Sequence, residues 1–235
     1  MTGKGQDAQR ACGREDEMQN RYKTIFKGGS GELVEKKSRF IATIRLAESE
    51  EDALAFIEET RKKYWDARHN CYAYTVGGNR EFTRCSDDGE PSGTAGRPML
   101  DVLLGEGLYN TAVVVTRYFG GVLLGTGGLV RAYSGAVQEG LRQSVVIEKQ
   151  AGISLALTAD YAFLGKLQYI AGENYLPILS SEYTDKVCLR VLVPSEQADA
   201  IQKAVTEATS GRVQMEKERE LYFAMAEGEV QIFTH

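Results

Sequence analysis

The residue types that could do chemistry gather in two glycine-rich loops between residues 86 and 133. Glycine is placed where the backbone needs a positive φ or a close approach, so this span is either tightly folded or a binding surface. The candidate residues of the first, acidic loop are Asp87, Asp88, Glu90, Ser92, Gly93, Thr94 and Gly96. Those of the second loop are Arg117, Tyr118, Gly120, Gly121, Gly127, Gly128 and Arg131.

The acidic loop has two interpretations, and the sequence leaves both open. Backbone N–H groups at a helix start attract anions, but nearby carboxylates would repel a phosphate unless a cation stood between them. The functional interpretation is therefore an anion site with Mg²⁺ held by Asp87, Asp88 and Glu90. The structural interpretation is a turn in which the same carboxylates accept hydrogen bonds from local N–H groups.

The second loop carries the opposite charge. Arg117 ends a predicted strand, and Arg131 lies about one turn into the helix that follows. Two guanidiniums converging there could bind a phosphate or carboxylate in bidentate fashion. Alternatively, one or both pair with the acidic loop, which would make the cluster structural and predict no ligand. We expect the two loops to face one another, although close packing alone would also explain their glycines.

Other familiar catalytic or metal motifs are incomplete. His69 and Cys71 share a face of a predicted strand, but with Cys85 they supply too few ligands for structural zinc. Their spacing is also weak support for cysteine–histidine catalysis, since such residues are neighbours by geometry alone. No serine lies in a G-x-S-x-G elbow, and G-T-G-G-L lacks the lysine of a phosphate-binding loop.

The pattern of apolar residues predicts the elements that hold these loops. The first half should begin with a hairpin of residues 22–27 and 32–37, a strand at 39–46 and a helix from the capping box of Ser49 and Asp52 to about Tyr64. A second hairpin, of residues 70–76 and 81–85, precedes the acidic loop, and a helix from Pro98 to Gly105 or Gly107 follows that loop. A central strand at 111–117, a helix at about 127–142 and a strand at 145–149 complete this half.

The second half has a simpler order of strands and helices. We predict strands and helices in the order β-α-β-β-α-β, at residues 153–159, 161–173, 176–183, 186–193, 195–209 and 212–217. This is the arrangement of a ferredoxin-like domain. The predicted fold class is α+β with two domains, 20–149 and 150–235, after a disordered tail at 1–19 in which Met18 is the expected natural start.

Charge and composition argue against a nucleic-acid-binding, membrane-spanning or exported protein. The formal net charge is -5; residues 150–235 hold 7 Lys+Arg and 12 Asp+Glu, and residues 1–149 hold 21 of each. A nucleic-acid binder usually shows a basic excess, which is missing here. We find no apolar run of about 18 residues and no signal-peptide core, so we expect a cytoplasmic protein. Its four scattered cysteines are then most simply free thiols.

Four ordered blocks carry a family resemblance: K-K-S-R-F-I-A from residue 36, H-N-C-Y-A-Y, D-D-G-E-P-S-G-T-A-G-R-P and V-V-V-T-R-Y-F-G-G-V-L-L-G-T-G-G-L-V-R-A-Y. Together they resemble the signature of the YigZ/Impact family over residues of about 20–147. The remainder is similar in layout to the small C-terminal domain of bacterial members. No catalytic residues are established for that family. The resemblance therefore marks Asp87, Asp88, Glu90, Arg117 and Arg131 as parts of the family signature and assigns them no role.

The resemblance implies a ribosomal-protein-like βαβ domain followed by a ferredoxin-like domain similar to one in elongation factor G. Eukaryotic Impact proteins regulate translation under amino-acid stress through a kinase pathway, a role that needs an extra N-terminal domain for which this chain has no room. We therefore expect a non-enzymatic factor, without a cofactor, that contacts the ribosome, a translation factor or RNA. The alternative is a Mg²⁺-dependent enzyme or binding protein for a phosphorylated small molecule.

Overall fold

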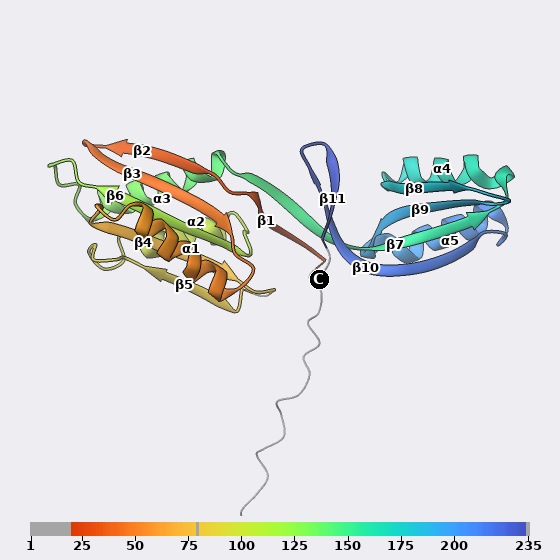
Figure 1. The fold of residues 1–235 in the computed structure, drawn as a ribbon, viewed down its shortest axis with the longest axis horizontal. Helices are drawn as coiled ribbons and strands as arrows, with labels where there is room; N and C mark the ends of the chain where they lie inside the picture. Colours follow the sequence, from red (N-terminus) through yellow and green to blue (C-terminus); the bar gives the residue numbers. More distant parts are fainter. Residues whose placement is uncertain (1–19, 79, 234–235) are drawn as a thin grey trace, which may run out of the picture.

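The computed structural model describes residues 20–78 and 80–233, which form two antiparallel sheets with helices packed on them (Figure 1). The fold is mixed α and β with two domains, as predicted. The predicted tail and the expected start at Met18 lie outside the described residues. No helix in the described part of the chain is long and apolar enough to cross a membrane.

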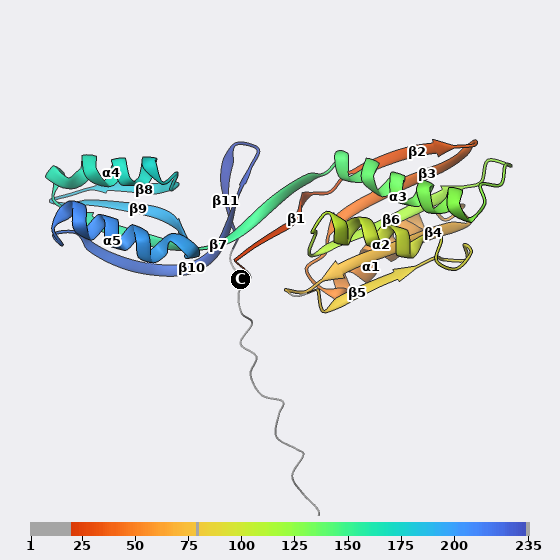
Figure 2. The same cartoon turned by 180° about the vertical axis from the view of Figure 1, so that it is seen from behind.

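The first domain is built around β6 (Thr111–Tyr118), the central strand of its five-stranded sheet. Both faces of β6 are buried because its side chains alternate between two cores. Val113 and Val115 face α2 (Gly96–Gly105) and α3 (Thr126–Arg142), whereas Ala112 and Val114 face α1 (Glu50–Lys63). Figure 2 shows α2 and α3 in front of the sheet, on the face opposite α1.

The strand order of this sheet is β2-β3-β6-β4-β5. The other strands are β2 (Ser30–Glu35), β3 (Ser38–Leu46), β4 (His69–Val76) and β5 (Phe82–Ser86). The predicted capping box is present, because Asp52 N donates to Ser49 Oγ and Ser49 N donates to Asp52 Oδ2, both at 3.0 Å. The predicted β4–β5 hairpin is also confirmed. The helix predicted to start at Pro98 begins two residues earlier, at Gly96.

The second sheet has the order β11-β10-β7-β9-β8, and the predicted β-α-β-β-α-β order of elements is present. The elements are β7 (Val145–Ala159), α4 (Leu164–Glu173), β8 (Ile178–Tyr183), β9 (Val187–Pro194), α5 (Ala198–Thr209), β10 (Gln214–Ala226) and β11 (Glu229–Phe233). A short 3₁₀ turn precedes each helix, at Tyr161–Phe163 and Ser195–Gln197. The strand β10 is longer than predicted, and β11 was not predicted.

The predicted hairpin of residues 22–27 and 32–37 is wrong. The strand β1 (Arg21–Lys27) pairs with β7, and β2 pairs with β3 instead. The glycines between β1 and β2 explain the difference: a Cβ on Gly29 would lie 2.2 Å from the carbonyl oxygen of Gln143. Residues 28–29 therefore pass closely against the end of α3 and do not form a hairpin turn.

The strand β7 joins the two domains. We predicted separate strands at 145–149 and 153–159, but the structure has one continuous strand of 15 residues. Its first part, from Val145 to Gln150, pairs with β1, and its second part pairs with β9 and β10. The predicted boundary between residues 149 and 150 thus falls inside a strand (Figure 1).

Candidate functional site

Asp87 caps the start of α2 from outside the helix. Its Oδ1 accepts hydrogen bonds from the backbone N–H groups of Ala95 (2.9 Å) and Gly96 (2.8 Å), and its Oδ2 accepts one from Gly93 (2.8 Å). The N-cap residue itself, Ala95, has no side chain able to do this. Partial burial raises the pKa of the Asp87 carboxyl, but the three N–H donors outweigh it and the pKa is lowered.

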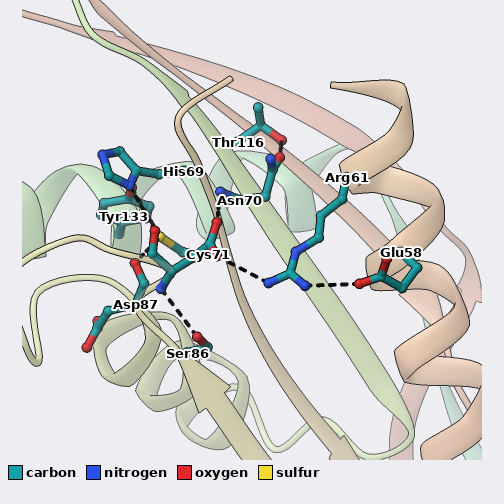
Figure 3. Close-up of polar contacts among 10 residues, drawn as sticks. Glu58, Arg61, His69, Asn70, Cys71, Ser86, Asp87, Thr116 and Tyr133 are labelled. Atoms are coloured by element: carbon teal, nitrogen blue, oxygen red, sulfur yellow. Dashed lines mark hydrogen bonds and ion pairs between the residues drawn. The ribbon is translucent and has the colours of Figure 1, made fainter. Parts of the chain in front are cut away.

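Asp88 ties the acidic loop to the sheet and to α1. Its Oδ2 accepts from the backbone N–H of Asn70 at 2.7 Å, and its Oδ1 lies 3.2 Å from Nη2 of Arg61. Its carbonyl oxygen lies 2.9 Å from His69 Nδ1. Figure 3 shows the Arg61 side chain reaching from α1 with Glu58 beside it.

Glu90 forms a buried ion pair with Arg117. Glu90 Oε1 lies 2.5 Å from Arg117 Nη1 and 2.8 Å from the Tyr133 hydroxyl, and the Glu90 and Arg117 side chains are only 3% and 8% exposed. Burial, together with Cys71 and Glu90, raises the pKa of Tyr133 far above its ordinary value, so the hydroxyl remains a donor. The carboxylate thus has two donors, and the pairing foreseen in the structural interpretation is present for this arginine.

Cys71 lies beside Asp87 and Tyr133 (Figure 3). Its Sγ is 3.0 Å from the Asp87 carbonyl oxygen and 3.3 Å from the Tyr133 hydroxyl, and the residue is fully buried. Burial raises the pKa of the Cys71 thiol to about 12. Because the thiolate is the nucleophile, this cysteine is poorly suited to covalent catalysis at neutral pH.

The three carboxylates do not form one cation site. Each is directed to a different set of donors: backbone N–H groups for Asp87, Arg61 and Asn70 for Asp88, and the buried arginine for Glu90. Within residues 20–78 and 80–233, no group of three or more His, Cys, Asp or Glu side chains is arranged to hold a metal ion. The Mg²⁺ site at Asp87, Asp88 and Glu90 thus stays a prediction, and His69, Cys71 and Cys85 are not among such groups in the described residues either.

The expected convergence of Arg131 with Arg117 on the acidic loop is not shown by any ion pair among the described residues. Arg131 is exposed on α3, and no ion pair of its side chain is found among the described residues. It lines a small surface cavity of about 220 Å³ at the end of β2. The other lining residues are Leu33, Glu35, Lys36, Leu124, Gly128 and Ala132.

The remaining predicted site residues lie in turns, at helix starts or on the surface. Ser92 and Gly93 lie in an exposed turn, Thr94 and Gly96 are buried at the start of α2, Gly120 and Gly121 follow β6, and Gly127 and Gly128 form the first turn of α3. Tyr118 donates to Asp66 Oδ1 at 2.7 Å. Gly120 allows a close backbone approach, since a Cβ there would lie 2.0 Å from the carbonyl carbon of Lys37.

Sequence reasoning did not single out Val122 and Leu123 of the apolar loop, which we define as residues 119–124. Phe119 is 48% exposed, Val122 43% and Leu123 82%. Large apolar side chains that gather in solvent are a common feature of interaction surfaces. The signal was present in the sequence as V-L-L between Gly121 and Gly125, where polar turn residues would be expected.

Comparisons with known proteins match both domains. The model of the Impact N-terminal domain matches residues 36–141, and that of a domain of unknown function, DUF1949, matches residues 157–212. The chain is 40% identical over 206 residues to the IMPACT family member YvyE of Bacillus subtilis, covering 88% of this chain and 94% of that protein. It is 39% identical to the IMPACT family member YigZ of Escherichia coli, covering 77% of this chain and 89% of that protein.

A solved structure agrees with the fold. A crystal structure of a hypothetical protein is 35% identical to this chain and superposes with a TM-score of 0.55, covering 86% of this chain and 98% of that one.

Proposed function

Because the chain belongs to the IMPACT family, we propose that it is a non-enzymatic cytoplasmic factor that regulates translation by binding a protein of the translation machinery. The family resemblance supplies the link to translation. The geometry of the first domain supports a binding role without catalysis there, since Asp87, Glu90 and Arg117 are engaged by internal partners.

The observation that carries the proposal is the apolar loop. Its exposed side chains present a surface that a protein partner can cover, and Leu124 at the end of the loop lines a cavity together with the cationic Lys36 and Arg131. A protein of the ribosome or a translation factor fits this surface better than RNA. RNA binding would need a basic excess, and the chain carries a net charge of -5.

The test is co-sedimentation with purified ribosomes, and capture by purified translation factors, at a defined salt concentration. The double variant Phe119→Ser/Leu123→Ser should bind at least about tenfold more weakly, since a few residues near the centre of an interface carry most of its binding energy. Tyr175→Ser is the matched control, because Tyr175 is 92% exposed but lies in the second domain. Absence of wild-type binding to ribosomes and factors, or equal binding of the double variant, contradicts the proposal.

The second candidate is binding of a phosphorylated small molecule at the Arg131 cavity. Lys36 and Arg131 line it against the single acid Glu35, at the N-terminal end of α3. Nucleotides or phosphate esters, with or without Mg²⁺, should then raise the melting temperature of the wild type but not of Arg131→Ala. No shift for the wild type removes this candidate.

A further inference from the structure

The outer edge of β8 is the starting observation. β8 is the last strand of the second sheet and pairs only with β9 among the described residues. The row of peptide groups on its other side is therefore open to a further strand. Its sequence, I-L-S-S-E-Y, contains no lysine or proline, two residues that commonly prevent such pairing, and the irregularity in its pairing with β9 is confined to Ile178–Ser180.

Exposed apolar and aromatic side chains lie at both ends of this edge. Ile178 is 45% exposed at the start of β8, and Tyr183 is 55% exposed at its end. Tyr183 stacks on Tyr161, which is 50% exposed, with ring centroids 6.4 Å apart. The Tyr161 hydroxyl donates to the carbonyl oxygen of Thr184 at 2.6 Å, which ties the Tyr161 ring to the chain just after β8. An incoming strand would find contacts for its side chains at both ends.

The charges near the outer edge of β8 indicate the kind of segment that could bind there. Residues 150–235 carry the whole -5 of the chain. Asp160 precedes Tyr161 in the sequence, and Asp185 and Lys186 follow Tyr183 closely. Glu182 of β8 shares the single Arg190 with Glu218. Exposed tyrosine faces also attract lysine and arginine side chains. The surface is thus suited to a basic segment and unsuited to the phosphates of RNA.

We propose that the outer edge of β8 binds an extended, Lys/Arg-rich protein segment, which adds to the second sheet as a further strand. The backbone supplies the main-chain hydrogen bonds, the Tyr161–Tyr183 pair and Ile178 contact the side chains of the segment, and the acidic surroundings select its charge. This surface is separate from the apolar loop, so the inference does not depend on what that loop binds.

The probes are a fluorescein-labelled (Lys-Val)₄ peptide and its acidic counterpart (Glu-Val)₄, measured by fluorescence anisotropy with the full chain. The basic peptide should bind, and its affinity should fall as salt is added. The double variant Ile178→Ser/Tyr183→Ser should bind it at least about tenfold more weakly. Tyr169→Ser, which removes an exposed tyrosine of α4 instead, should bind like the wild type.

Hydrogen exchange of the wild type keeps the proposal testable if the double variant fails to fold. The bound basic peptide should slow exchange at residues 178–183. The proposal is overturned by lack of binding at millimolar peptide, by equal binding of the acidic peptide, by protection confined to another element, or by an oligouridine that displaces the basic peptide from this edge. Light scattering that shows a dimer with β8 protected before any peptide is added would assign the edge to a second copy and also overturn it.

Discussion

The Glu90 carboxylate holds two buried donors, Arg117 and Tyr133, that would both lose their acceptor if it were removed. Breaking one side of a buried ion pair leaves an uncompensated charge, which costs about 3–5 kcal/mol. We therefore expect Glu90→Ala to lower the free energy of unfolding by that amount in urea titrations. Glu59→Ala, which breaks the exposed pair with Arg45, should hardly move the unfolding midpoint. Equal effects of the two changes would show that the pair is not structural.

Asp87 should make stability depend on pH. Its pKa is lowered in the folded chain, so its contribution is present above the unfolded value of about 3.9 and is lost as the pH falls through the folded value. The difference in unfolding free energy between the wild type and Asp87→Asn should therefore shrink between about pH 6 and about pH 3. Using this difference removes the contributions of other carboxylates with lowered pKa. A difference that stays constant over this range would refute the capping role.

Cys71 and Cys85 should differ in reactivity. Burial raises the pKa of Cys71 to about 12, whereas Cys85 is exposed. Maleimide labelling of the native protein at neutral pH, read by peptide mass spectrometry, should modify Cys85 and leave Cys71 unmodified until urea is added. Rapid native labelling of Cys71 would show that the cluster opens.

Elements that depend on local patterns were predictable, and those that depend on distant partners were not. The capping box of Ser49 and Asp52 specifies α1 by itself, and the uninterrupted apolar run of β6 marks a strand buried on both faces. The pairing of β1 with β7 joins residues more than a hundred positions apart, and no local spacing reveals such a partner. The missed strand β11 did have a signal, the turn at Glu227 and Gly228 followed by E-V-Q-I-F.

The residues of the candidate site could also be predicted only as far as local patterns reach, because their partners lie far away in the sequence. The sequence marked the acidic residues and Arg117 as candidates, but spacing along the chain cannot say whether a carboxylate faces a ligand or a protein donor. The structure decides this for Glu90, whose partners come from β6 and α3. Arg131 looked equivalent to Arg117 in the sequence. It differs because its position on α3 is exposed, whereas the strand position of Arg117 is buried.

The turn of β2 into β3 depends on Gly120. Lys36 and Lys37 both have left-handed backbone conformations, with φ of 46° and 66°, and the Gly120 backbone lies directly against Lys37. Gly120→Ala would place a Cβ 2.0 Å from a backbone carbon, so the loop must shift, at a cost of about 1–3 kcal/mol or more. Gly172→Ala in α4 meets nothing within 4 Å and should be neutral or slightly stabilising. Urea unfolding of both variants checks this contrast, and a neutral Gly120→Ala contradicts it.

At the scale of the whole molecule, the two domains share one packed joint. Lys149 of β7 is 6% exposed; its Nζ lies 3.4 Å from Glu48 of the first domain and 4.1 Å from the ring centre of Phe233 in β11. Tyr22 of β1 contacts the ring of Tyr222 in β10, with centroids 5.3 Å apart. The strands β1, β10 and β11 thus pack against β7, and we expect this joint to hold the two domains in a fixed arrangement.

Inserting Gly-Gly between Gln150 and Ala151 tests this rigidity. The insertion interrupts β7 where its pairing passes from β1 to β9 and β10. The wild type should scatter X-rays as one elongated particle, with a radius of gyration above the roughly 18 Å of a compact chain of this size. The insertion should broaden the distribution of interatomic distances, because glycine adds free backbone rotations at the joint. The same insertion in the exposed turn between Ser210 and Gly211 should leave that distribution unchanged, since the turn lies at one end of the second domain. If the wild type already shows the broad distribution, β7 connects the domains without fixing their arrangement.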